Sequence, residues 1–283
     1  MTIQKRYAME TNVKNALRHC AEVAALWICC TNLGHGQDSQ ILFGVRMVDR
    51  QLIVRSLDLA NPQAVQERGK LSQQTGERLN GVFQNADRSI NVLRTTTARG
   101  VPLRALVRNI GIPGVLTDAA ERAIGGLSST EAISSLLLPI SGPPVALVAH
   151  YSDTPPFFLV TLQTGSQWII TTRKRLDADA RYGHLTQCPD GIVYATSMEP
   201  EAHPRLVQID LHKNAVVPVH EIAFNGVSLQ NDVADLTCGR SGQLYALADP
   251  TYSRSNSLFA INSITGAATW ISAFDVERMA FVH

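Results

Sequence analysis

Polar side chains precede five strand-like runs of the sequence at corresponding positions. If these runs converge as strands on one centre, the side chains form a ring at one mouth of a central channel. Carboxylate and amide oxygens are ligands that Ca²⁺ prefers, and a divalent cation held there could polarise a carbonyl group. Alternatively, the mouth is polar because water fills it. The five predicted ligand-binding residues are Glu77, Glu131, Arg181, Asn231 and Glu277.

Other catalytic signatures are missing from the sequence. It has no G-x-S-x-G elbow, no glycine-rich loop with phosphate-binding spacing and no H-E-x-x-H motif. His150, His184 and His283 fall on strand-like runs, but at different offsets within those runs. We therefore expect these histidines to be satisfied by backbone groups rather than to converge on one site.

The five cysteines show neither a C-x-x-C motif nor zinc-type spacing, so we expect no structural metal site. Cys188 and Cys238 fall at the ends of neighbouring runs that are predicted to be inner strands. A disulfide needs Cα atoms within about 7 Å, which is tight for adjacent blades. This argument favours two buried free thiols.

Residues 242–271 contain the clearest structural unit, which consists of a strand, a loop, a second strand, a turn at Thr265-Gly266 and a third strand. The runs are short, rich in aromatic and branched residues, and bounded by Gly, Pro, Asn and Ser, which is typical of strands. The predicted buried positions are Leu244, Ala246, Leu258 and Ile261.

Similar units recur at intervals of roughly 50 residues, a spacing expected of four-stranded propeller blades. The anchor position of the unit falls at Phe43, Val92, Val145, Tyr194 and Tyr245. The turn position, where a left-handed conformation is expected, falls at Asn61, Asn109, Gly165, Asn214 and Gly266.

The first unit contains only three predicted strands, whereas residues 278–283 match the opening strand of a unit and nothing follows them. In a closed ring, this last strand would complete the first unit beside residues 41–45. Residues 116–124 suggest a short helix inserted near the second unit.

The units resemble those of β-propeller repeat proteins, with a first strand, a D/S-G turn, "LYAL" and then "LF-I-x-x-x-TG-A-T". The resemblance covers residues 133–283 well and implies an all-β propeller, with five blades closed by the C-terminal strand. It implies no activity, because propellers host many functions. The segment Asn231-Asp232-Val233, followed by Leu244-Tyr245, also resembles lactonase-type propellers.

Residues 1–36 stand apart from residues 37–283, which form the predicted propeller domain. Basic residues precede the apolar block 23–30, and Gly34-His35-Gly36 offers small residues for cleavage, as in a secretory signal peptide. The alternative is an amphipathic helix. The protein would be secreted or periplasmic in the first case and cytoplasmic in the second.

A formal net charge of +1 with scattered arginines argues against nucleic acid as a partner. No apolar run reaches the roughly 18–20 residues that span a bilayer. We therefore expect a monomeric binding or interaction module without a cofactor, whose loops contact a protein, a glycan or a small ligand. The alternative is a propeller-type hydrolase or lactonase that uses Ca²⁺ at the channel mouth.

Overall fold

The computed structural model describes residues 40–72, 77–96, 104–112, 115–117, 121–176, 180–199, 202–213 and 215–282. Every regular element in these ranges is a β-strand. They belong to the second of two units, Ser39–His283. The predicted N-terminal helix or signal segment lies outside the described residues. Within the described ranges, the chain has no apolar helix of membrane-spanning length.

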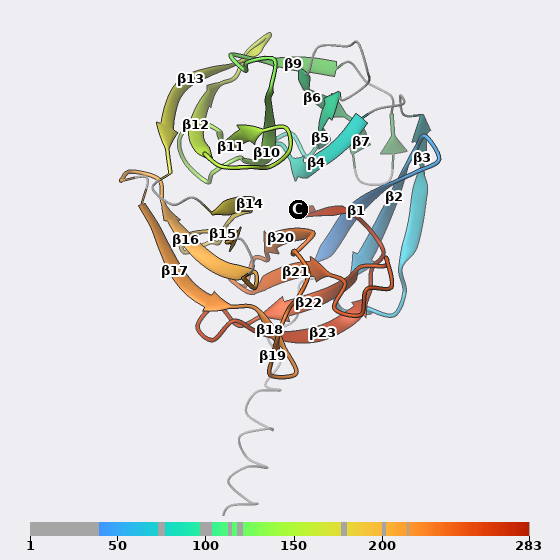
Figure 1. The fold of residues 1–283 in the computed structure, drawn as a ribbon. Helices are drawn as coiled ribbons and strands as arrows, with labels where there is room; N and C mark the ends of the chain where they lie inside the picture. Colours follow the sequence, from blue (N-terminus) through green and yellow to red (C-terminus); the bar gives the residue numbers. More distant parts are fainter. Residues whose placement is uncertain are drawn as a thin grey trace, which may run out of the picture. The chain divides into compact units, whose positions relative to one another are not determined.

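The strands pair into four large sheets and one small hairpin (Figure 1). The first sheet consists, in order, of β24 (Arg278–Val282), β1 (Ile41–Val48), β2 (Gln51–Asp58) and β3 (Gln66–Ser72). The second consists of β10 (Glu131–Leu137), β11 (Val145–His150), β12 (Phe158–Gln163), β13 (Trp168–Arg175), β9 (Glu121–Gly125), β6 (Arg104–Asn109), β5 (Ile90–Thr96) and β4 (Glu77–Gln84).

The third sheet consists of β14 (Arg181–Gln187), β15 (Val193–Met198), β16 (Arg205–Asp210) and β17 (Ala215–Glu221). The fourth consists of β19 (Val227–Ser228), β18 (Ala223–Phe224), β23 (Ala267–Ala273), β22 (Ser257–Ile261), β21 (Leu244–Ala248) and β20 (Asp235–Cys238). The hairpin pairs β7 (Gly111–Ile112) with β8 (Val115–Leu116).

Five strands line the middle of the described unit. β4, β10, β14, β20 and β24 contact one another in a cycle, and Figure 1 shows them in the centre with the later strands of each sheet farther out. This arrangement is propeller-like. In the eight-stranded sheet, two antiparallel groups meet edge to edge. They are β10-β11-β12-β13 and β4-β5-β6-β9, and β13 joins them by pairing in parallel with β9.

Burial is greatest in the second strand outward from the centre. β11 and β15 are buried along nearly their whole length, whereas β13 is mostly exposed and β17 is at most half-buried. The reason is that neighbouring sheets pack face to face, so their second strands are covered on both faces. One apolar cluster, for example, joins Leu147 and Leu159 of the second sheet to Tyr182 and Val193 of the third.

The predicted pairing of the chain's last strand is confirmed. β24 runs antiparallel to β1, with Leu42 opposite Phe281 and Gly44 opposite Met279. Met279 and Phe281 are 2% and 6% exposed and pack in a cluster with residues of β1, β2, β21 and β22. The four buried positions predicted in the clearest unit are also confirmed, namely Leu244, Ala246, Leu258 and Ile261.

The predicted helix near residue 120 is wrong, because Glu121–Gly125 forms strand β9. Its backbone pairs with β6 on one side and with β13 on the other. Tertiary pairing of this kind overrides a weak local helix preference.

The predicted left-handed turn residue is confirmed at Gly266, whose φ is 72°. A Cβ there would lie 2.1 Å from the Glu221 carbonyl oxygen, so the position requires glycine. Asn61, Asn109 and Gly165 do not adopt positive φ. At Asn109 the side chain instead accepts a hydrogen bond from the Gly111 amide, and Gly111 takes the positive φ. Asn214 lies outside the described residues.

The prediction of two free thiols is also wrong, because Cys188 and Cys238 form a disulfide. Their Cα atoms are 5.3 Å apart, within the range that a disulfide requires. Cys238 ends β20, and Cys188 follows β14 directly. These inner strands contact each other at the centre of the described unit.

We expect Phe281→Ala to destabilise the whole described unit, because it removes buried aromatic surface from the closing strand. Loss of a buried Phe side chain costs about 3–5 kcal/mol, which chemical denaturation would measure as a lower free energy of unfolding. Ile264→Ala is the matched control, since Ile264 is 76% exposed. Equal unfolding free energies for the two variants would contradict a stabilising role for β24.

Candidate functional site

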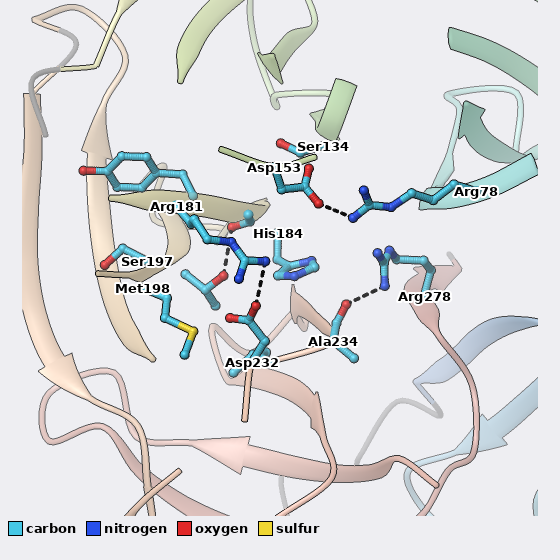
Figure 2. Close-up of a pocket in the computed structure, with 14 residues that line it drawn as sticks. Arg78, Ser134, Asp153, Arg181, His184, Ser197, Met198, Asp232, Ala234 and Arg278 are labelled. Atoms are coloured by element: carbon cyan, nitrogen blue, oxygen red, sulfur yellow. Dashed lines mark hydrogen bonds and ion pairs between the residues drawn. The ribbon is translucent and has the colours of Figure 1, made fainter. Parts of the chain in front are cut away.

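A polar cavity of about 200 Å³ opens where the inner strands begin. Residues from four of the five inner strands line it, together with the loop after β11 and the segment before β20 (Figure 2). We call it the central cavity. Its charged and polar lining includes Arg78 (β4), Ser134 (β10), Asp153, Arg181 and His184 (β14), Asp232 and Arg278 (β24).

Two of the three guanidinium groups in the central cavity form ion pairs. Arg78 pairs with Asp153, which lies in the turn after β11, and Arg181 Nη2 lies 2.9 Å from Asp232 Oδ2. Figure 2 shows both pairs facing the interior of the cavity. The aspartates thus compensate two of the three positive charges.

Arg278 differs from the other two arginines. Its Nη1 donates hydrogen bonds to the carbonyl oxygens of Ala234 (2.7 Å) and Glu277 (2.6 Å). Its buried Nε has no partner among the described residues, and none of their carboxylates forms an ion pair with it. Burial lowers the pKa of the guanidinium, and the nearby Asp235 opposes that effect. The group therefore carries unused hydrogen-bonding capacity at the cavity.

His184 lies in the same cavity and is held by a carboxylate. Its Nδ1 is 3.3 Å from Asp235 Oδ1, and both side chains are largely buried. Asp235 in turn accepts hydrogen bonds from the backbone amides of Leu236 (2.9 Å) and Met279 (2.6 Å). The carboxylate therefore connects β14, β20 and β24 at the centre.

The backbone at His184 is unusual for a residue within a strand, with a φ of 59°. The register between β14 and β15 shifts between Gly183 and Thr186, so His184 lies in a β-bulge. Hydrogen bonds fix the bulge, since Leu185 N donates to Ser135 Oγ and Thr196 Oγ1 donates to the Gly183 carbonyl oxygen. Bulges of this kind redirect a side chain, here into the cavity.

Of the five predicted ligand-binding residues, only Arg181 lines the central cavity. Glu131 lies at the start of β10, where a hydrogen bond from Arg173 holds its pKa below the usual range. The other four contact neighbouring groups, Glu77 with Arg94, Glu131 with Arg173, Asn231 with the Asp249 carbonyl oxygen, and Glu277 with the Met47 amide. Their role in ligand binding stays a prediction.

The residues directly after three of these positions do line the cavity, namely Arg78, Asp232 and Arg278. Glu77 and Arg78 lie in β4, and successive side chains of a strand point to opposite sides, so a shift of one residue there exchanges the channel side for the side between sheets. Aligning the repeated units in the sequence located the mouth of the channel. It did not determine which of two adjacent residues faces the channel.

The prediction that the histidines are satisfied by backbone groups is wrong for His184, whose partner is Asp235. His150 Nδ1 lies 2.6 Å from Ser152 Oγ, and His283 is outside the described residues. A signal for His184 was present in the sequence, because Gly183 precedes it within a strand-like run. Glycine at such a place indicates a bulge.

The charges of the central cavity suit an anionic group. Among the described residues, no group of three or more His, Cys, Asp or Glu is arranged to hold a metal ion. Each of the two lining aspartates is paired with an arginine, so Arg278 is the lining guanidinium that has no ion-pair partner among the described residues; the nearby Asp235 is held by His184. A ligand carboxylate or phosphate could pair with that guanidinium.

No family model and no curated protein match this chain. Its fold is similar to that of a protein of unknown function from Bacteroides caccae, with a TM-score of 0.52 and 12% identity over 87% of this chain and 100% of that chain. TolB from Acinetobacter baumannii matches with a TM-score of 0.48 and 13% identity, over 89% of this chain and 57% of TolB. These similarities concern the fold and assign no function.

We expect Glu77→Gln to lower stability, because Glu77 and Glu121 together compensate Arg94, whose side chain is only 2% exposed. Removing one partner of a buried ion pair costs about 3–5 kcal/mol, and the remaining pair with Glu121 makes this the upper limit of the expected fall in the free energy of unfolding. Glu131→Gln breaks a more exposed pair with Arg173 and should cost less than about 1 kcal/mol. Unchanged stability of Glu77→Gln would contradict a structural role and leave ligand binding as its remaining explanation.

Proposed function

We propose that this chain is a binding module whose central cavity takes a small ligand with an anionic group. The observation that carries the proposal is Arg278, which reaches the cavity without a carboxylate partner among the described residues and with its buried Nε unpaired. An anionic ligand would satisfy this group. Arg78 and Arg181 would strengthen the attraction from two other strands, and a small ligand fits a cavity of about 200 Å³.

We further propose that the described unit is a five-bladed propeller. Each blade would consist of one inner strand and the three strands that follow it outward in its sheet. The cycle of contacts among the inner strands supports this division, as do apolar clusters that join successive groups. The proposed blades are β24-β1-β2-β3, β4-β5-β6-β9, β10-β11-β12-β13, β14-β15-β16-β17 and β20-β21-β22-β23.

The alternative function is a propeller-type hydrolase or lactonase with Ca²⁺ at the mouth. It requires the predicted ring of Glu77, Glu131, Asn231 and Glu277 to bind the cation. Each of these residues already has a protein partner, so the ring would have to exchange those contacts for the metal. A protein or glycan partner would bind through the same mouth if it presented an anionic group.

We expect succinate and phosphate to raise the melting temperature of the intact chain by binding the folded state. Arg278→Gln should weaken the binding of the better ligand about 10-fold or more, since it removes a charged hydrogen-bond donor. Isothermal titration calorimetry would measure the dissociation constants. Arg205→Gln is the control, because Arg205 pairs with Glu221 away from the cavity.

A melting temperature that rises with Ca²⁺ and falls with EDTA, but does not respond to either anion, would support the metal-dependent alternative instead. Equal affinities for wild type and Arg278→Gln would show that Arg278 does not contribute to ligand binding. Arg278→Lys keeps the charge and should retain part of the affinity, which separates loss of the site from loss of the fold.

We also propose that the protein is exported, as the signal-peptide interpretation of residues 1–36 predicts. The Cys188–Cys238 disulfide supports this, because disulfides persist mainly in oxidising compartments. Protein isolated from its natural source should begin at Gln37, and an unreduced digest should contain the linked pair of peptides. A native chain that retains Met1 or Thr2 and has both thiols free would contradict export.

A further inference from the structure

We propose that His184 and Asp235 act as an acid–base pair that hydrolyses a small ester bearing a carboxylate. The inference rests on the proposed binding function, because the same central cavity would hold the substrate. The inference adds a chemical reaction to the ligand binding that is proposed for the cavity. Asp235 would be a positioning residue, whereas His184 would contact the reacting atoms.

The hydrogen-bonding partners determine which nitrogen of His184 can react. Asp235 Oδ1 lies 3.3 Å from Nδ1, so the carboxylate favours the tautomer that carries a proton on Nδ1. The lone pair is then on Nε2, which has no hydrogen-bond partner among the described residues. Figure 2 shows the imidazole ring between Arg181 and Arg278. Nε2 is thus available to a water molecule or substrate in the cavity.

The carboxylate that orients His184 is itself fixed. Two backbone amides, of Leu236 and Met279, donate to its two oxygens. A carboxylate held in this way can stabilise the imidazolium that forms when His184 accepts a proton. A base oriented by a third group is the arrangement that acid–base catalysis needs.

The backbone conformation of His184 supports a role beyond packing. A positive φ at a residue other than glycine is strained, and it persists only where surrounding contacts hold it. Here the hydrogen bonds at Ser135 and Thr196 hold the bulge. Their effect is to turn the imidazole towards the guanidinium groups.

The proposed reaction needs only water as a second reactant. Nε2 of His184 takes a proton from water while the water oxygen bonds to the carbonyl carbon of the ester. Arg278 donates to the oxyanion that develops on the carbonyl oxygen, as charged donors do in such sites. The bond from carbon to the alcohol oxygen then breaks, and that oxygen takes the proton from His184. The products are a carboxylic acid and an alcohol.

The remaining charged groups of the cavity would bind and orient the substrate. Arg181 and Arg78 face the cavity with their partners Asp232 and Asp153, and either guanidinium can also bind the substrate's own carboxylate. This predicts selectivity for an ester with a carboxylate over a neutral ester.

The test uses the intact chain with the 4-nitrophenyl monoester of succinic acid in excess EDTA, and follows release of 4-nitrophenol against pH. We expect a rate above buffer that rises as one group loses its proton, and a slower reaction with 4-nitrophenyl acetate. His184→Asn should lower the rate about 100-fold or more, the range of general acid–base catalysis. Asparagine tolerates positive φ, so the bulge should survive.

Succinate affinity, measured by calorimetry, should change little in His184→Asn, which shows that the variant folds and still binds. Asp235→Asn keeps only one of the two oxygens that accept from backbone amides and removes the negative charge beside the imidazole, so it should lower the rate while shifting its pH profile. His150→Gln is the matched control, because His150 contacts Ser152 rather than the cavity and should leave the rate unchanged.

Four outcomes would overturn the proposal in distinguishable ways. A wild-type chain that binds succinate but releases no nitrophenol contradicts the acid–base pair and leaves the binding function intact. A chain that binds neither succinate nor phosphate contradicts both. A His184→Asn variant as active as wild type, or a wild-type rate that appears only with Ca²⁺ added, removes His184 from the chemistry.

Discussion

The pairing of β24 with β1 is the contact on which the rest of the described unit depends. It joins the last described strand of the chain to the first one, so that the inner strand of the first sheet comes from the opposite end of the sequence. Without it, β1 would present an unpaired edge, and the cycle of inner strands would lack one member. The same strand contributes Arg278 to the central cavity and the Met279 amide to Asp235.

The arrangement of the strands around one centre explains why the cavity is polar, whereas the space between neighbouring sheets is apolar. Away from the cavity, apolar side chains of the second and third strands outward, such as Leu147 and Leu258, are fully buried between neighbouring sheets. At the beginnings of the strands no neighbouring sheet covers the centre, and charged groups occupy it. These groups are mostly paired, which limits the cost of burying them. Arg278 is the exception, and a ligand that completes its hydrogen bonding would stabilise it.

Much of the architecture could be predicted from the sequence, because it follows from local patterns repeated at a regular spacing. The anchors Phe43, Val92, Val145, Tyr194 and Tyr245 all lie in the second strand outward from the centre. The site was less predictable, since it depends on the register of single residues. A shift of one position separates Glu77 from Arg78. The disulfide depends on how closely β14 and β20 approach each other, which no sequence spacing encodes.

Hydrogen–deuterium exchange on the intact chain, followed by mass spectrometry, tests the closure by β24 most directly. Amides paired across a buried ladder exchange only when the structure opens. The closure predicts that peptides covering 41–48 and 278–282 exchange as slowly as those covering the buried strand Val145–His150, and that all three lose protection together in denaturant. Rapid exchange of 278–282 while Val145–His150 stays protected would show that β24 does not hold the unit closed.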